Sequence, residues 1–211
     1  MVIGLSGKYC SGKNAAATIF EGMQIPSIDV DKLGHLALES EIGRIEKEFG
    51  SRVIQEEESC KGGAAARTVD RKALGEIVFA EPEKLKALES IIHPWMVSET
   101  ERRIREYTSG GSRHIVINAA ILFKMGLHSH CHCVVWVEAP LYMRIIRALN
   151  RDPLNLPAVL KRIYAQRKLK PKPLEKYVDI YRIVNKSGMD SLRMEIRSVL
   201  DLIEQKGSHG R

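Results

Sequence analysis

The stretch Val2-Ile3-Gly4-Leu5-Ser6-Gly7-Lys8-Tyr9-Cys10-Ser11-Gly12-Lys13-Asn14 decides the fold of this chain. Its opening apolar run, Val2 to Ser6, predicts a strand, and the Ala-rich segment from Gly12 to Gly22 predicts a helix. Between them, Gly7 to Lys13 fits the pattern G-x-x-x-x-G-K in the strand, loop and helix setting that a phosphate-binding loop requires. The sequence therefore predicts a P-loop that binds a nucleoside triphosphate.

The chemistry of such a loop follows from its backbone. Glycines allow conformations that a side chain forbids, the N–H groups converge on phosphate oxygens, and the following helix adds the positive end of its dipole. Lys13 is expected to bridge the β and γ phosphates. A plain glycine turn joining strand to helix is the alternative, and Lys13 argues against it. The candidate nucleotide-binding residues are Gly7, Lys8, Tyr9, Cys10, Ser11, Gly12, Lys13, Asn14 and Ala15.

Two amides stand where P-loop proteins usually carry metal ligands. Asn14 occupies the position of the Ser or Thr whose hydroxyl binds Mg²⁺, although an amide oxygen can also ligate the ion or hold one of its waters. Asn118 ends the predicted strand His114 to Asn118, where many P-loop proteins have an acidic residue. We expect ATP and Mg²⁺ as cofactors, with a metal site short of negative charge. Lys8 is hypothesised to offset part of the phosphate charge.

Asp31 follows the second predicted strand, Ile25 to Ile28, at the sheet edge where ligands gather. A carboxylate at this place can deprotonate an acceptor hydroxyl and help to hold Mg²⁺. Asp29 or Asp31 could instead simply cap the next predicted helix, Lys32 to Glu39.

The rest of the chain alternates helical and strand-like segments, which predicts a parallel sheet covered by helices. We expect an α/β, P-loop NTPase-type three-layer fold with a parallel five-stranded sheet and helices on both faces. The remaining predicted segments are an amphipathic segment Ile42 to Phe49, a polar loop Gln55 to Arg67, a helix entry at Thr68 to Arg71 with Asp70 as the cap of a helix to Phe79, a helical region Pro82 to Tyr107 kinked or broken near His93-Pro94, a strand Val134 to Val137, helices Pro140 to Asn150 and Leu156 to Lys170, a strand Val178 to Val184 and a helix from Met189.

Length and composition suit one domain. The chain has 211 residues, of which 44% are hydrophobic and 28% charged, enough for a full core over residues 1–211. No basic stretch or long apolar run precedes the loop, and we therefore expect no signal peptide, no membrane partner and a cytoplasmic location. The four cysteines are irregularly spaced and are interpreted as thiols.

The positive charge is concentrated in one segment. The chain has a formal net charge of +7, and the excess is local: between Pro140 and Lys186, 12 basic residues face three acids. Few aromatic residues are interleaved with them, as a surface that stacks on bases would need. We therefore favour a basic segment that folds over a polyphosphate, and expect no nucleic-acid partner.

Separated segments of the chain share their order and spacing with one family of enzymes. They are Ile3 to Gly7 with Gly12-Lys13, Asp29-Val30-Asp31-Lys32-Leu33-Gly34-His35, Asp70-Arg71-Lys72-Ala73-Leu74 with Val78-Phe79, Leu88 to Ile92-His93-Pro94, Ile121-Leu122-Phe123 with Gly126-Leu127, and Arg147, Arg151 and Gln166. Together they resemble the dephospho-CoA kinase family, P-loop enzymes that phosphorylate the ribose 3′-hydroxyl of dephospho-CoA in the last step of CoA synthesis.

The resemblance implies roles for residues on the ATP side. Lys13 and the loop would bind ATP, and Arg147 and Arg151 would be lid arginines over the transferring phosphate, within a lid region of residues 140–176. A planar guanidinium grips phosphate oxygens in pairs. A solvated helix face is the alternative for either arginine.

The resemblance also implies an acceptor side. Asp31 would be the base for the 3′-hydroxyl and, with Asn14, a Mg²⁺ ligand. A helical insertion of residues 68–108 would bind dephospho-CoA, and His93, Leu122 and Phe123 would contact it. A helix-ending core histidine is the alternative for His93.

Other functions remain open at this level. A nucleoside monophosphate or shikimate kinase would share the loop and the lid, but lack the context of Asp31 and His93. An ATP-binding or CoA-binding sensor with weakened catalysis is favoured by Asn14 and Asn118. The run His128 to Cys133 is dense in imidazole and thiol, yet zinc sites usually combine pairs of ligands from two places. A loop followed by the start of a buried strand is the preferred interpretation of that run.

Overall fold

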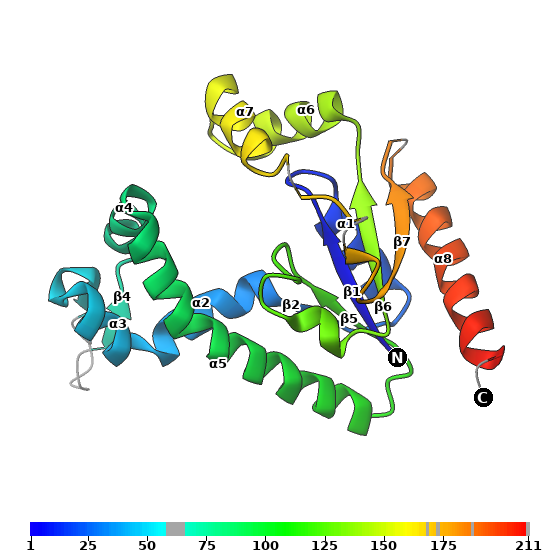
Figure 1. The fold of residues 1–211 in the computed structure, drawn as a ribbon, viewed down its shortest axis with the longest axis horizontal. Helices are drawn as coiled ribbons and strands as arrows, with labels where there is room; N and C mark the ends of the chain where they lie inside the picture. Colours follow the sequence, from blue (N-terminus) through cyan, green and yellow to red (C-terminus); the bar gives the residue numbers. More distant parts are fainter. Residues whose placement is uncertain (58–65, 168, 172–173, 187, 210–211) are drawn as a thin grey trace. The chain divides into compact units, whose positions relative to one another are not determined.

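The chain forms two compact units, each described here by itself. The computed structural model describes residues 1–57, 66–167, 169–171, 174–186 and 188–209. The first unit comprises residues 1–29 and 103–211, and the second comprises residues 30–102. Figure 1 shows the elements of both units coloured along the chain.

The first unit contains a parallel five-stranded sheet, as the sequence predicts. Its strands are β1 (Val2–Gly7), β2 (Ser27–Asp29), β5 (Ile115–Asn118), β6 (Cys133–Glu138) and β7 (Asp179–Val184). The order is β2-β5-β1-β6-β7, with every neighbouring pair parallel. β1 is therefore central, and Figure 1 shows it between β5 and β6. The loop after β1 consequently emerges in the middle of the carboxyl edge, where parallel sheets bind ligands.

Two helices cover one face of this sheet. α1 (Lys13–Gly22) and α8 (Met189–His209) contribute Phe20 and Ile196 to a core that also contains Ile3 and Val135 from the strands. Every residue of β1 and β5 is buried, which explains why their sequences are apolar throughout and do not alternate. β7 lies at the edge and keeps several exposed side chains.

The segment 119–131 approaches the other face of β1 closely. A Cβ on Gly4 would lie 2.8 Å from Cδ2 of Leu122 and 3.0 Å from Sγ of Cys131, so only glycine fits there. The segment includes η2 (Leu127–His130), and Leu127 is fully buried. The central strand is thus enclosed from both sides.

The second unit is mainly helical. It contains α2 (Val30–Ser40), α3 (Ile42–Phe49), η1 (Ser51–Val53), β3 (Ile54–Glu57), β4 (Ala66–Val69), α4 (Arg71–Ala80) and most of α5 (Pro82–Ser109). Its own core includes Ile45, Phe49, Leu74 and Ile91. Asp70 caps α4, as predicted, because its Oδ1 accepts hydrogen bonds from the N–H groups of Lys72 at 2.9 Å and Ala73 at 3.0 Å.

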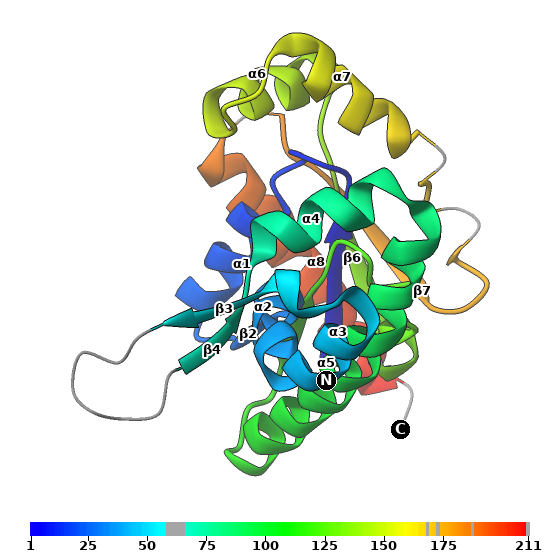
Figure 2. The same ribbon diagram turned by 90° about the vertical axis from the view of Figure 1, so that its left-hand side faces the viewer.

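The hairpin of β3 and β4 corrects part of the sequence interpretation. These antiparallel strands, visible as a ribbon in Figure 2, pair Ile54 with Val69. The prediction of a polar loop from Gln55 was wrong at its ends, and Thr68 and Val69 form a strand and not a helix entry. Ile54 and Val69 belong to the core of this unit, so tertiary burial decides their conformation. Residues 58–65 of the predicted loop lie outside the described residues.

Two helix boundaries also differ from expectation. α5 continues through Pro94 without a break. Pro94 removes one N–H from the helix ladder, while buried Ile91 and Met96 on either side hold the helix in place. α6 (Leu141–Arg151) agrees with the prediction, whereas α7 (Leu156–Ala165) ends before Lys170, because the next residue, Gln166, leaves the helix. In the described part of the chain, no helix has the length and hydropathy needed to span a membrane.

Candidate active site

The phosphate loop is shaped by its two glycines. A Cβ on Gly7 would lie 2.5 Å from the carbonyl oxygen of Val137, and one on Gly12 would lie 2.0 Å from Nδ2 of Asn185. Gly12 also has a φ of 100°, in the left-handed region, and Cys10 has a φ of 58°. The left-handed conformation costs a non-glycine residue such as Cys10 about 1–2 kcal/mol of conformational free energy, and such strain is characteristic of functional loops.

Two amide side chains lie beside Lys13. Its Nζ donates a hydrogen bond to Oδ1 of Asn118 at 2.6 Å, and Nδ2 of Asn118 lies 3.5 Å from Oδ1 of Asn14. Asn118, which is 2% exposed, is the last residue of β5 and pairs in register with Asp29 of β2. Asn118, at the end of β5, therefore contacts Lys13 through an amide. An acidic residue at position 118 would form an ion pair with Lys13 instead.

These groups have the chemistry that a magnesium ion requires. Oxygens of Asn14 and Asn118 lie at the start of α1 and the end of β5, and the carboxylate of Asp29 belongs to the adjacent strand. Mg²⁺ takes oxygen ligands and usually keeps several waters and phosphate oxygens, so this set fits the ion with little protein charge. Ala15, in the first turn of α1, can offer only its backbone to a nucleotide.

Arg147 reaches the loop from α6. Its Nη1 donates to the carbonyl oxygen of Ser11 at 3.2 Å, and its Nη2 donates to the carbonyl oxygen and Oδ1 of Asn185 at 3.2 and 3.1 Å. Nδ2 of Asn185 in turn donates to the Ser11 carbonyl oxygen at 3.0 Å. The sequence prediction selected Arg147 but missed Asn185. The sequence feature that could have identified Asn185 is its position immediately after the last strand, at the carboxyl edge of the sheet.

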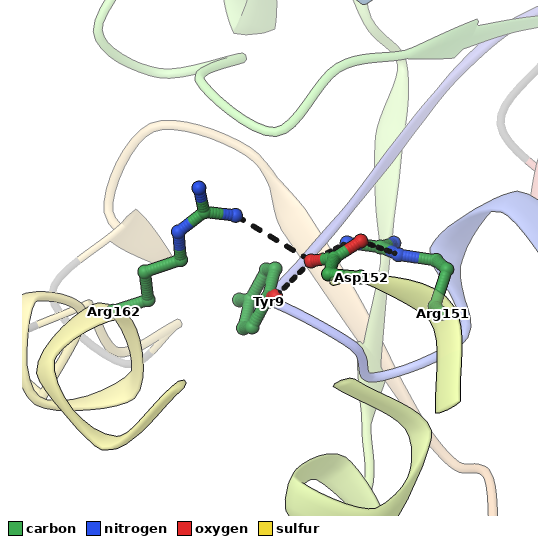
Figure 3. A network of polar contacts seen from close by, with 4 residues as sticks. All are labelled: Tyr9, Arg151, Asp152 and Arg162. Atoms are coloured by element: carbon green, nitrogen blue, oxygen red, sulfur yellow. Dashed lines mark hydrogen bonds and ion pairs between the residues drawn. The ribbon is translucent and has the colours of Figure 1, made fainter. Parts of the chain in front are cut away.

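A second cluster, the Tyr9–Asp152 network, joins the loop to the end of α6 and to α7 (Figure 3). It consists of Tyr9, Arg151, Asp152 and Arg162. The hydroxyl of Tyr9 donates a hydrogen bond to Oδ2 of Asp152. Arg151 donates two hydrogen bonds to the same carboxylate, from Nε to Oδ1 at 2.9 Å and from Nη2 to Oδ2 at 3.1 Å. Nη1 of Arg162 lies 3.4 Å from the same carboxylate. Both guanidinium groups also approach the Tyr9 ring, at 5.2 and 5.8 Å from its centroid.

The network shifts the proton affinities of its members. The hydrogen bonds from Arg151, and next from Tyr9, lower the pKa of Asp152 to about 2. The same pairing with Asp152 raises the pKa of Arg151. Burial, followed by the hydrogen bond to Asp152, raises the pKa of Tyr9. Arg151 thus stays charged and bound to Asp152, and Asp152 is the second site residue that the sequence prediction missed.

The backbone of Tyr9 is held as well as its side chain. Its N–H donates to Oε1 of Gln166 at 2.6 Å, and its carbonyl oxygen accepts from Nε of Arg144 at 2.8 Å. Arg144 is 7% exposed, and its burial lowers its pKa. The lid region therefore fixes the middle of the loop at several points.

The predicted acceptor residues are distributed over both units. Asp31 is exposed in the first turn of α2, and His93 is half-buried in α5, both in the second unit. Leu122 is fully buried against Gly4, while Phe123 stacks on His128 with ring centroids 5.0 Å apart. Leu122 and Phe123 belong to the first unit with Lys13, whereas Asp31 and His93 belong to the second, so a shared role of all four stays a proposal.

The His128 to Cys133 run forms η2 and the start of β6, as the preferred interpretation predicts. Nδ1 of His132 accepts a hydrogen bond from the N–H of Val2 at 3.0 Å, and Sγ of Cys131 donates to the carbonyl oxygen of Leu127 at 3.4 Å. Burial raises the pKa of Cys131 and Cys133 to about 12, so both are neutral thiols. Among the described residues, no three His, Cys, Asp or Glu side chains gather as a metal site.

A central strand, a glycine-shaped loop, a lysine at the start of the next helix and an arginine of α6 that contacts the loop define a P-loop phosphotransferase of the kinase type. A family model described as dephospho-CoA kinase matches residues 1–189. The chain therefore belongs to the dephospho-CoA kinase family.

Individual relatives agree with this assignment. The dephospho-CoA kinase of Bacillus licheniformis is 31% identical over 208 residues, which cover 95% of this chain and 96% of that protein. The dephospho-CoA kinase of Thermus thermophilus is 29% identical, with 100% of this chain and 96% of that protein covered. Among solved structures, the Campylobacter jejuni dephospho-CoA kinase has a TM-score of 0.68 at 25% identity, covering 98% of each chain.

Proposed function

We propose that this protein transfers the γ-phosphoryl group of ATP to the ribose 3′-hydroxyl of dephospho-CoA, giving CoA and ADP. Membership of the family supports the reaction, and the observation that carries the mechanism is the arrangement around the loop. Lys13 lies at the start of α1, positioned by Asn118, and Arg147 contacts the loop carbonyl of Ser11. Donors fixed in advance around a phosphoryl group are the main source of catalysis in phosphoryl transfer.

The roles on the ATP side follow from the contacts. The N–H groups of residues 7–15 bind the phosphates, and Lys13 bridges the β and γ groups. Arg147 neutralises charge that develops on the transferring group. Arg151 is paired with Asp152, so we propose that it reaches ATP only when the Tyr9–Asp152 network rearranges.

Asp31 is proposed as the base that receives the proton of the 3′-hydroxyl. It is an exposed carboxylate in the first turn of the helix that directly follows β2. The helical region 68–108, with His93, is proposed to bind the acceptor, together with Phe123 and, through packing, Leu122. The proposed setting is the cytoplasm, consistent with Cys10, Cys131 and Cys133 being free thiols.

Magnesium would be held by Asn14 and Asp31, with the carboxylate of Asp29, which pairs in register with Asn118, adding a further oxygen group. When bound, the ion would neutralise charge on the β and γ phosphates. Asn118 would orient Asn14, since the two amides are adjacent. Lys13 would bind the same phosphates from the protein side.

The proposal is tested by measuring ADP release in the presence of dephospho-CoA, and of a nucleoside monophosphate as the competing acceptor. Turnover should require dephospho-CoA. Asp31→Asn should lower kcat by at least about a hundredfold, the scale of a lost general base, while ATP affinity stays within about twofold.

Asp190→Asn is a matched control, because Asp190 is also an exposed aspartate in the first turn of a helix, α8. If both substitutions have equally small effects on kcat, Asp31 acts only as a negative charge at the start of a helix and is not the catalytic base. Tight ATP binding without turnover on either acceptor would favour a nucleotide sensor instead.

A further inference from the structure

A small cavity lies beside the phosphate loop. Its volume is about 120 Å³, and it is lined by Lys8, Glu138, Ala139 and Arg144. Lys8 follows β1, Glu138 ends the adjacent strand β6, and Arg144 lies on α6. The cavity is therefore at the carboxyl edge of the sheet, next to the loop and within the first unit.

Arg144 is a buried cation without a counter-charge. It is 7% exposed, and its Nε is satisfied by the Tyr9 carbonyl oxygen, but its Nη2 is buried and has no hydrogen-bond partner among the described residues. No described carboxylate lies within ion-pair distance of its guanidinium group. Buried charges are normally paired, and a buried unsatisfied donor indicates a missing ion or water.

The other charged groups at the cavity are also unpaired within the described part of the chain. Lys8 is half-buried and has no ion pair or side-chain hydrogen bond there, and neither does the carboxylate of Glu138. Two cations and one carboxylate therefore face one space, which favours an anion. A water needs about 10–15 Å³, so this cavity can accommodate a tetrahedral oxyanion.

The carboxylate restricts the kind of anion. A phosphoryl group with a second pKa of about 6 can carry a proton and donate it in a hydrogen bond to Glu138, which a fully ionised oxyanion cannot do. The cavity also adjoins the loop, since Lys8 is a loop residue and Arg144 donates a hydrogen bond to the carbonyl oxygen of Tyr9. An anion bound here would thus be continuous with phosphates held by the loop.

We propose that Lys8 and Arg144 bind the terminal phosphoryl group of ATP, with Glu138 accepting a hydrogen bond from it. This inference rests on the proposed function for the identity of the nucleotide. It adds a second pair of cations to the phosphate-binding residues, beside Lys13 and Arg147. The consequence is selectivity for a triphosphate over a diphosphate.

Calorimetric titration of the full chain with ATP and with ADP tests the inference without an acceptor, and therefore independently of turnover. Lys8→Gln and Arg144→Gln should each weaken ATP binding by about tenfold or more, because a charge-assisted bond to the phosphoryl group is lost, and change ADP binding by less than about twofold. Arg197→Gln is the matched control, since it removes one exposed positive charge from α8.

Three results would overturn the inference. Equal weakening of ATP and ADP would mean that Lys8 and Arg144 only shape the loop. Unchanged binding of both nucleotides would mean that the cavity holds water. Binding of inorganic phosphate to the ATP-saturated protein, abolished by Lys8→Gln, would make this a separate phosphate site. If Arg144→Gln does not fold, Lys8→Gln decides alone, because the Lys8 side chain has no described hydrogen bond to lose.

Discussion

The two ends of the phosphate loop are built differently. At the Lys13 end, two amides follow one another, with Asn118 between Lys13 and Asn14. At the Tyr9 end, the ring, hydroxyl and backbone of one residue are all held by charged or polar groups of residues 144–166. The amide pair beside Lys13 thus contrasts with the ion-pair network at Tyr9.

This difference suggests a division of labour. A carboxylate at position 118 would compete with phosphate for Lys13, and the amide of Asn118 competes less. Ion pairs at the Tyr9 end are mostly exposed, so each contributes little, but together they fix where α6 and α7 meet the loop. The three substitutions below test this comparison.

The largest effect is expected from Lys13→Met, at the Lys13 end of the loop. Removing the lysine takes away a charged donor to the β and γ phosphates, and kcat/KM for ATP should fall by at least about a hundredfold. Steady-state kinetics with dephospho-CoA measure the loss. Lys47→Met, which removes an exposed lysine of α3, should leave the kinetics unchanged. An Lys13 variant that retains most of its activity would contradict the assignment of the loop.

A smaller effect is expected from Asn118→Asp. The new carboxylate would add charge beside Asn14, so the Mg²⁺ concentration for half-maximal activity should fall about threefold to tenfold. Activity measured against Mg²⁺ at saturating ATP gives this value. Asn155→Asp, which keeps a capping group at the start of α7, serves as the control. An unchanged Mg²⁺ requirement would show that Asn118 does not act on the metal.

The smallest effect concerns Tyr9 and the proton affinity of Asp152. The pKa of Asp152 is lowered from 3.8 to about 2, so its contacts stabilise the folded protein above about pH 4 and lose that contribution as the pH falls from 3.8 to about 2. Tyr9→Phe should raise this pKa by less than about one unit, and Arg151→Gln should raise it further, because Arg151 is the larger cause.

An NMR titration of the Asp152 carboxyl group measures both shifts. A pKa of Asp152 that is already near 3.8 in the unmodified protein would mean that the Tyr9–Asp152 network does not form in solution. In that case the two ends of the loop would not differ as described.

Sequence patterns predicted the sheet well because its strands carry strong local signals. The apolar runs around Ile3, Val116 and Val135 are too short for helices and are buried on both faces, so they have few alternatives. The hairpin was missed because Gln55 and Thr68 look polar locally, and only the pairing of their two segments with each other reveals their conformation. The predicted break at Pro94 is absent for a related reason, since packing keeps α5 continuous through a residue that usually ends helices.

The candidate site shows the same limit. Lys13 and Arg147 were identified from motif and resemblance, and the structure places both at the loop. Asn185, Asp152 and Arg144 were missed as site residues, because no local pattern marks an asparagine after a strand or one arginine among many. Their partners in the loop are 135 to 174 residues away in the sequence, as in the bonds from Arg144 to Tyr9, from Tyr9 to Asp152 and from Asn185 to Ser11.

The amino-acid sequence by itself determined the central strand, the loop and the order of strands and helices, because glycine conformation and apolar periodicity are local properties. The tertiary structure alone brings together the polar groups at that loop: the amides beside Lys13, the ion-pair network at Tyr9 and Arg144, whose Nη2 has no hydrogen-bond partner among the described residues. Electrostatics acts through space across short distances, and the fold alone sets those distances.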